Sequence, residues 1–184
     1  MVTLALDPGL NGLGCALFRD NELIQAWYSP GAERELSTTR GRDGEGLLDS
    51  GPRAWLSVAR SIAWLNDDER TRPSRIVVEL MKVYPGRAGV GDPNRLLALQ
   101  AINGAALALF PGALAGGVLA RDWKHQVKKD VMTRRIIFWL ATRGWYERVL
   151  VPGRSPALVH NAIDAAGLGL VALRLEGRLS KAPW

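Results

Sequence analysis

The sequence contains almost no cysteine and lacks the marks of a secreted chain. Cys15 is the one cysteine among 184 residues, which excludes an internal disulfide framework and fits a reducing compartment. The first six residues carry no basic side chain and are followed by Asp7, so we expect no signal peptide. Internal repeats and low-complexity tracts are also lacking. We therefore expect one domain over residues 1–184, located in the cytoplasm.

Long uninterrupted apolar runs are lacking too, and one stretch has to be considered as a membrane span. Leu96 to Ala120 carries no charge over 25 residues, and about 20 apolar residues suffice to cross a bilayer. Polar residues and glycine-containing pairs interrupt this stretch at Gln100, Asn103, Pro111-Gly112 and Gly116-Gly117. A buried helix, a Pro-Gly break and a buried strand explain it better, so we expect no membrane partner.

Positive charge is concentrated in one segment. The net charge is +6, and the segment from Arg121 to Arg154 accounts for all of it, with nine Lys and Arg against three acids. The nine are Arg121, Lys124, Lys128, Lys129, Arg134, Arg135, Arg143, Arg148 and Arg154. Such a segment favours a polyanionic partner, most commonly nucleic acid, while a solvated helix face is the alternative.

The pattern of apolar residues predicts an α/β fold. A three-stranded antiparallel meander comes first, and two parallel strands follow, so we expect a five-stranded mixed sheet flanked by helices. The strands are expected at Val2 to Asp7, Gly12 to Arg19, Glu22 to Tyr28, Arg75 to Leu80 and Leu114 to Ala120. The helices are expected at Arg53 to Leu65, Asp92 to Leu109, Gln126 to Arg143 and Ala157 to Arg174. Pro30 to Pro52 is expected to be a flexible polar loop.

Three acids stand at meaningful places in this pattern. Asp7 and Glu79 each end an apolar strand, and the carboxyl ends of neighbouring parallel strands meet at one edge of a sheet, where open α/β sheets place their ligand sites. Asp164 lies on the last helix among small residues, which allow that helix to lie close to the sheet. His160 and Asn161 precede Asp164 by four and three residues, so they project to the same side. We expect these side chains to share one crevice.

Several carboxylates in one crevice repel one another unless a cation relieves the repulsion. Mg²⁺ and Mn²⁺ prefer oxygen ligands, and two such ions about 4 Å apart activate water and stabilise the leaving oxygen in phosphodiester cleavage. The pattern therefore indicates a metal-dependent nuclease. Ordinary structural roles remain open for each residue, as a turn residue for Asp7 and as a polar residue at a helix start for His160.

The ordered motifs resemble those of RuvC-like Holliday junction resolvases of the RNase H-like superfamily. The resemblance rests on Leu4-Ala5-Leu6-Asp7-Pro8-Gly9 with Gly12 and Gly14, on Val77-Val78-Glu79, and on His160-Asn161-Ala162-Ile163-Asp164-Ala165. The Asp92-Pro93-Asn94 helix start and Trp123-Lys124 look more like the phage-type members.

The resemblance implies an RNase H-like fold and a homodimeric crossover-junction endonuclease of a bacterial or phage-infected cell. It would cleave Holliday junctions or other branched DNA with two Mg²⁺ ions (or Mn²⁺) in each active site. Asp7, Glu79 and Asp164 would be ligands and catalytic residues. The fourth position falls on Asn161 as a metal ligand, with His160 beside it as a catalytic residue.

By the same resemblance, Lys124, Lys128 and Lys129 would line the DNA path and contact phosphates. Arg134 on the basic helix is a further candidate, and so are Lys82, Tyr84 and Arg87 on the loop after Glu79.

Three alternative functions stay open. An RNase H-type or YqgF-type nuclease would cleave RNA or an RNA–DNA hybrid with the same acids. A nucleotide-binding protein of the actin-like class is disfavoured because it needs two such domains. A catalytically inactive DNA-binding module is disfavoured by three intact acids.

Overall fold

The apolar runs assemble into one mixed sheet. In the computed structural model, residues 1–9, 12–30, 56–80, 93–124, 127–151 and 156–179 are described, and they form a six-stranded sheet in the order β5-β4-β1-β2-β3-β6. Strands β1 (Val2–Gly9), β2 (Gly12–Arg19) and β3 (Glu22–Pro30) make the predicted antiparallel meander. Strands β4 (Arg75–Leu80) and β5 (Leu114–Leu119) extend it in parallel from β1.

The sixth strand was not predicted. Strand β6 (Val149–Leu150) pairs in parallel with β3, where Val149 is opposite Ala26 and Leu150 is opposite Trp27. None of the five expected strands covers this segment, because a two-residue strand is too short to produce a periodic pattern. Its pairing satisfies backbone groups along part of the outer edge of β3. Arg148 supports it by donating a hydrogen bond to the Leu23 carbonyl.

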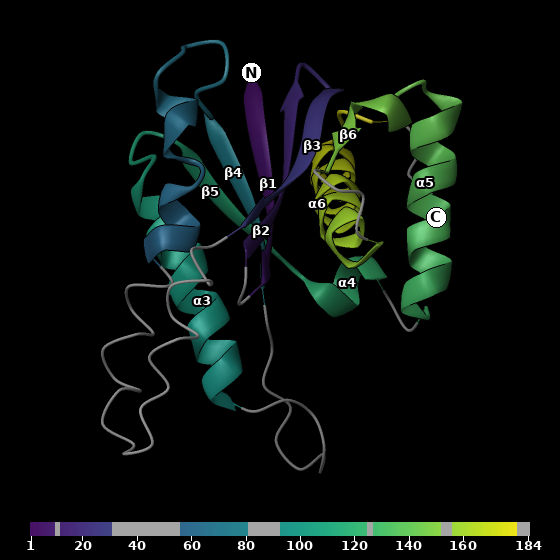
Figure 1. Ribbon diagram of the computed structural model, residues 1–184. Coiled ribbons are helices and arrows are strands. Elements are labelled where there is room, and N and C mark those ends of the chain that lie inside the picture. Colours follow the sequence, from purple (N-terminus) through teal and green to yellow (C-terminus); the bar gives the residue numbers. More distant parts are fainter. Residues whose placement is uncertain (10–11, 31–55, 81–92, 125–126, 152–155, 180–184) are drawn as a thin grey trace.

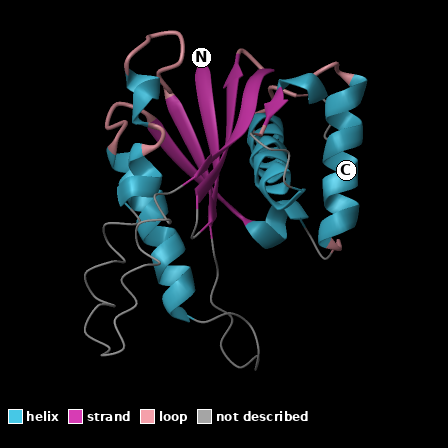
Figure 2. Cartoon of the chain, viewed as in Figure 1, coloured by secondary structure: helices cyan, strands magenta, loops and turns pink. Residues whose placement is uncertain are grey.

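Helices cover both faces of the sheet (Figures 1 and 2). They are α3 (Pro93–Ala108), α4 (Ala120–Lys124), α5 (Lys129–Thr142) and α6 (Pro156–Leu175). Residues 56–60 are also helical, and the 3₁₀-helices η2 (Ala63–Asn66) and η3 (Tyr146–Arg148) complete the set. The predicted basic helix starts three residues later than expected, at Lys129, and the short helix α4 before it was not predicted. The predicted loop lies outside the described residues except for Pro30.

The core has one half on each face of the sheet. On one face, α5 and α6 pack on side chains such as Ala5, Phe18 and Val77. On the other, α3 and residues 56–66 pack on Leu4, Leu6 and their neighbours. The α6 segment Leu158–Leu175 is long and apolar enough to cross a membrane, and 67% of it is buried inside the protein.

Glycine lets α6 approach the sheet closely enough to reach the edge where Asp7 lies. Gly14 is opposite Asp7 in the β1–β2 pairing, and a Cβ atom on Gly14 would lie 2.1 Å from the backbone oxygen of Asn161. A side chain at this position is therefore incompatible with the position of α6. Gly169 has the same function further along α6, where an added Cβ would meet the ring of Phe18 at 2.2 Å.

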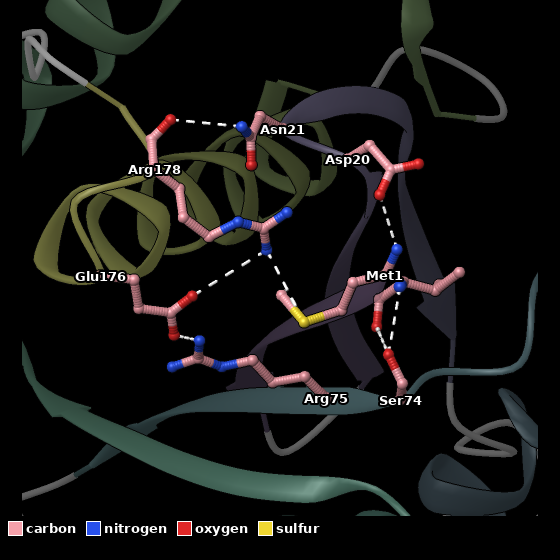
Figure 3. A network of polar contacts seen from close by, with 8 residues as sticks. Met1, Asp20, Asn21, Ser74, Arg75, Glu176 and Arg178 are labelled. Atoms are coloured by element: carbon pink, nitrogen blue, oxygen red, sulfur yellow. Dashed lines mark hydrogen bonds and ion pairs between the residues drawn. The ribbon is translucent and has the colours of Figure 1, made fainter.

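A polar network fixes the other end of α6, at the edge of the sheet where β1 and β4 begin (Figure 3). Glu176 pairs with Arg75 at the start of β4 and with Arg178, which also contacts the Met1 sulfur. Asp20 accepts a hydrogen bond of 2.6 Å from the Met1 amino group. The C-terminal end of α6 is thus held against β1 and β4, and the direction of the helix toward Asp7 is defined.

Candidate active site

Three carboxylates converge at one edge of the sheet. Asp7 lies near the end of β1 and Glu79 near the end of β4, one position beyond the last paired residues of these parallel strands, Leu6 and Val78. Asp164 reaches them from α6. Glu79 and Asp164 are 3% and 4% exposed, so their charges need partners. The three acids line one cavity of about 350 Å³. The structure therefore brings together the three acids that the strand and helix patterns single out.

The partner of two of these acids is a lysine. The Lys124 Nζ atom donates a hydrogen bond of 2.8 Å to Glu79 Oε2 and lies 3.1 Å from Asp164 Oδ2. Helix α4 directs it there, anchored by the fully buried Trp123, whose ring centroid lies 4.6 Å from the same nitrogen. Burial favours the neutral amine, but Asp7, Asp164 and Glu79 outweigh it and raise the pKa of Lys124 above its ordinary value. Lys124 is therefore the cation at the centre of the cluster.

One lysine does not balance three carboxylates. Burial raises the pKa of Asp7 well above its usual range, and the charges of Glu79 and Asp164 raise it further, while Lys124 opposes this. A hydrogen bond between the Asp7 and Glu79 side chains also favours the protonated form of Asp7. The cluster therefore retains a proton on Asp7 more readily than an isolated aspartate does. A second positive charge would release that proton.

His160 lies beside the carboxylates on α6. Burial lowers its pKa, and the positive charges of Lys129 and Lys124 lower it further against the opposing effect of Asp164, so the neutral ring is favoured. Its Nδ1 atom lies 3.0 Å from Thr133 Oγ1. The Thr133 hydroxyl has a single hydrogen and donates it to the Lys129 carbonyl, so it accepts from Nδ1–H. This leaves the lone pair on Nε2.

The Nε2 atom of His160 is buried next to an acid. It lies 3.2 Å from Asp164 Oδ2, and within the described part of the chain it has no partner of hydrogen-bond geometry. Two electron-rich atoms at this distance are a favourable arrangement only when a proton or a cation is shared between them. This orphaned nitrogen is an observation that fits a cation site.

The oxygen-rich donor set also fits a hard divalent ion. As folded, however, Lys124 lies between Glu79 and Asp164, and the described residues contain no group of three His, Cys, Asp or Glu side chains arranged to hold a metal ion. Asn161 lines the same cavity as the acids, and its backbone packs on Gly14. Metal ligation by Asp7, Glu79, Asn161 and Asp164 stays a prediction, as do the catalytic roles.

The residues predicted to contact DNA differ in their exposure and in their ion-pair partners. Lys128 and Lys129 are exposed at the start of α5, and Lys129 also lines the carboxylate cavity. Arg134 is exposed and pairs with Asp130 at 2.8 Å. Lys124, expected on the DNA path, instead has its ammonium group within the acid cluster. Lys82, Tyr84 and Arg87 lie outside the described residues.

Sequence reasoning missed two supporting residues. Thr133 orients His160, as described above, and Asn103 on α3 is buried and donates a hydrogen bond of 3.1 Å to the Glu79 carbonyl. A threonine on a helix and an asparagine in an apolar helix carry no motif. The position of Lys124 did have a signal in the sequence. Lys124 follows β5, which runs parallel to β1 and β4 and therefore ends at the same edge of the sheet as Asp7 and Glu79.

Comparison with known proteins gives the fold a name. No protein-family model matches the chain, and no curated protein matches it significantly. Among solved structures, Thermus thermophilus RuvC matches with 16% identity and a TM-score of 0.54 over 97% of this chain and 98% of that one. The chain has the fold of RuvC. The motif resemblance to the RuvC-like resolvases is thus confirmed at the level of the fold, and the mixed α/β sheet is confirmed with one strand more than predicted.

Two further structures agree. T. thermophilus RuvC in complex with a Holliday junction substrate matches with 15% identity and a TM-score of 0.57 over 97% of both chains. The yeast mitochondrial Holliday junction resolvase Ydc2 matches with 12% identity and a TM-score of 0.53 over 96% of this chain and 80% of that one. The RuvC fold therefore covers nearly the whole sequence, with the carboxylate cluster at the edge formed by the ends of β1 and β4.

Proposed function

We propose that this chain is a divalent-metal-dependent nuclease that cleaves Holliday junctions or other branched DNA. The observation that carries the proposal is the convergence of Asp7, Glu79 and Asp164 in one cavity that Lys129 also lines. Carboxylates in a crevice supply metal ligands, and exposed lysines beside them supply phosphate contacts. The RuvC fold supports junction DNA as the substrate.

Asp7, Glu79 and Asp164 would hold Mg²⁺ or Mn²⁺, with the His160 Nε2 atom or the Asn161 amide oxygen as the further ligand. When bound, such ions activate water and stabilise the charge that develops on the leaving oxygen. Because Lys124 now neutralises Glu79 and Asp164, these acids exchange one cation for another when they bind metal. We expect this exchange to free the Lys124 ammonium for the negatively charged phosphate of the substrate.

Residues in and around the cavity would bind and orient the substrate. Lys128 and Lys129 stand exposed where the DNA backbone would pass. His160, neutral and held by Thr133, is placed to accept a proton at Nε2 or to fix the orientation of Asp164. Because Glu79 and Asp164 are buried, bulk water is excluded from their contacts with a cation, and each of these contacts is stronger.

The decisive experiment offers the purified protein three substrates with and without Mg²⁺. These are a labelled four-way DNA junction, a linear DNA duplex of the same sequence, and an RNA–DNA hybrid. We expect Mg²⁺-dependent cleavage of the junction and little of the duplex. Cleavage of the hybrid alone would instead identify an RNase H-type or YqgF-type enzyme with the same acids.

We further propose that the protein acts as a homodimer in the cytoplasm. Cutting a junction in paired strands takes two active sites, and each chain supplies one carboxylate cluster. Light scattering of the protein with and without junction DNA measures the number of chains per complex. A single chain on each junction would contradict the dimer without contradicting the nuclease.

A further inference from the structure

A larger groove lies next to the carboxylate cavity. It has a volume of about 1070 Å³ and is bounded by β3, β6, α5, η3 and the start of α6. Figure 1 shows α5 on the β6 side of α6, and the groove lies among these elements. Its volume is slightly above the range of about 300–1,000 Å³ that is usual for small-molecule sites. It therefore has room for a nucleoside.

The groove and the carboxylate cavity share a wall. Thr133 and His160 line the groove, while their neighbours in sequence, Met132 and Asn161, line the cavity. The His160 ring is part of that wall, since Nδ1 lies 3.0 Å from Thr133 and Nε2 lies 3.2 Å from Asp164. A ligand in the groove would thus be separated from the carboxylates by one imidazole ring.

The chemistry of the lining suits a base and not a phosphate. Tyr28 and Tyr146 supply aromatic surface, and Gln25 and Thr133 supply hydrogen-bonding groups. In the part of the chain that the structure describes, no Lys or Arg side chain lines the groove, and Glu147 adds a negative charge. Aromatic faces stack on any base, and carboxamide and hydroxyl groups bond to base edges.

The cations lie outside the groove. Arg134 and Arg135 follow Thr133 directly on α5, and both are exposed. Lys129 is one helical turn before Thr133 and is exposed as well. A nucleic-acid strand that keeps its phosphates along this outer face would have its bases directed inward, because charge and lining differ between the two surfaces.

We propose that this groove binds an unpaired nucleobase of the strand whose phosphate lies in the carboxylate cavity. This inference rests on the proposed function and adds a recognition site to it. A base in an intact duplex would first have to leave the stack, at a cost of a few kcal/mol. Bases at a branch point are already less constrained by stacking and pairing. A base can therefore enter the groove at a lower free-energy cost from branched DNA than from linear DNA, which would favour binding of branched DNA.

The test removes bases from the DNA and side chains from the groove in combination. Four-way junctions carrying a single abasic nucleotide at successive positions around the branch point are titrated with the protein in EDTA, and the dissociation constant is measured by anisotropy. Loss of the base that enters the groove should weaken binding about five-fold or more. Tyr146→Ala should remove most of this penalty at the same position, because the base has then lost its stacking partner.

Tyr146 suits this test because it is 40% exposed, so its truncation leaves no buried cavity. Phe138→Ala is the matched control, since Phe138 is an aromatic residue on α5 that is 72% exposed and lies outside the lining. The control should keep the full penalty of the abasic junction. Gln25→Ala, within the lining, should reduce that penalty as Tyr146→Ala does.

The possible results separate the two proposals. If the wild-type protein binds and cleaves junctions but no abasic position shows a penalty that Tyr146→Ala removes, the groove is not a base site and the nuclease stands. If the protein binds a four-way junction no better than linear duplex and cleaves neither, the proposed function is wrong. The inference that the groove binds a base is then wrong as well, because it rests on that function.

Discussion

The ammonium group of Lys124 lies 2.8 Å from the carboxylate of Glu79, within the cluster of acids that we propose binds metal. Glu79 belongs to β4 and Lys124 to α4, and the two residues are 45 positions apart in the sequence. The same nitrogen is 3.1 Å from Asp164. The chain thus supplies its own cation to two of the acids, and the proposed metal would share these carboxylates with Lys124.

Lys124→Met should destabilise the protein when metal is absent. It leaves Glu79 and Asp164 buried without a cation, and breaking a fully buried ion pair costs about 3–5 kcal/mol. Lys124 keeps 26% of its side chain exposed, and the acids respond by taking up protons, so we expect a smaller loss of about 2–4 kcal/mol. Urea denaturation in EDTA measures it.

Mn²⁺ should rescue this variant more than it stabilises the wild-type protein. Without the lysine the acids bind the ion without first releasing another cation, so the midpoint of thermal unfolding rises more per unit of added Mn²⁺. Lys128→Met is the control, because Lys128 is exposed and lies outside the lining of the cavity. An equal response of both variants to Mn²⁺ would show that Lys124 does not compete with metal.

The sequence predicts the acids better than it predicts their partner. Asp7 and Glu79 end apolar strands, and the rule that parallel strands end at one edge is enough to place them together. The place of Lys124 after β5 indicates the right edge of the sheet, but its contact with Glu79 and Asp164 depends on α4, which has five residues and no periodicity to read. Similarly, β6 depends on an open edge of β3, and the orientation of His160 depends on Thr133 across two helices. These features come from tertiary packing, which local pattern does not encode.

Asp7→Asn should abolish cleavage while leaving junction binding intact. The amide is a weak ligand for a hard cation, so we expect a loss of about 100-fold or more in rate. The phosphate contacts of Lys128 and Lys129 are unaffected, so the dissociation constant should change less than about two-fold. Cleavage assays and anisotropy titrations measure the two effects. Normal cleavage by this variant would show that Asp7 is not in the active site.

The same substitution should change the dependence of stability on pH. Because the pKa of Asp7 is raised in the folded protein above its ordinary value of 3.8, the folded state holds a proton that the unfolded state releases. The stability linked to this group is complete below pH 3.8 and is lost as the pH rises through the raised pKa. The side-chain amide of the Asp7→Asn variant does not titrate, so the variant does not lose stability in this way. The variant should thus gain stability relative to wild type as the pH rises, and a constant difference between their urea midpoints would contradict this.

Lys128→Ala with Lys129→Ala should weaken DNA binding and reduce its dependence on salt. Each phosphate contact contributes about −0.9 to the slope of log K against log salt, so removing two contacts should flatten the slope by about 1.8. Arg60→Ala, an exposed cation on the helical residues 56–60, is the control and should leave the slope unchanged. An unaltered slope in the double variant would exclude both lysines from the DNA path.

Gly14→Ala tests whether the position of α6 determines the site. In a strand interior this exchange normally stabilises a protein by about 0.5–1 kcal/mol. Here the added Cβ would lie 2.1 Å from the backbone oxygen of Asn161, so α6 must move away from β2, at a cost of about 1–3 kcal/mol. The matched control is Gly104→Ala in α3, where an added Cβ meets nothing within 4 Å and should stabilise the helix by about 0.8–1 kcal/mol. Opposite signs in urea denaturation are expected. Cleavage should fall only in the Gly14 variant, because Asp164 and His160 move with the helix while Asp7 and Glu79 stay on the sheet.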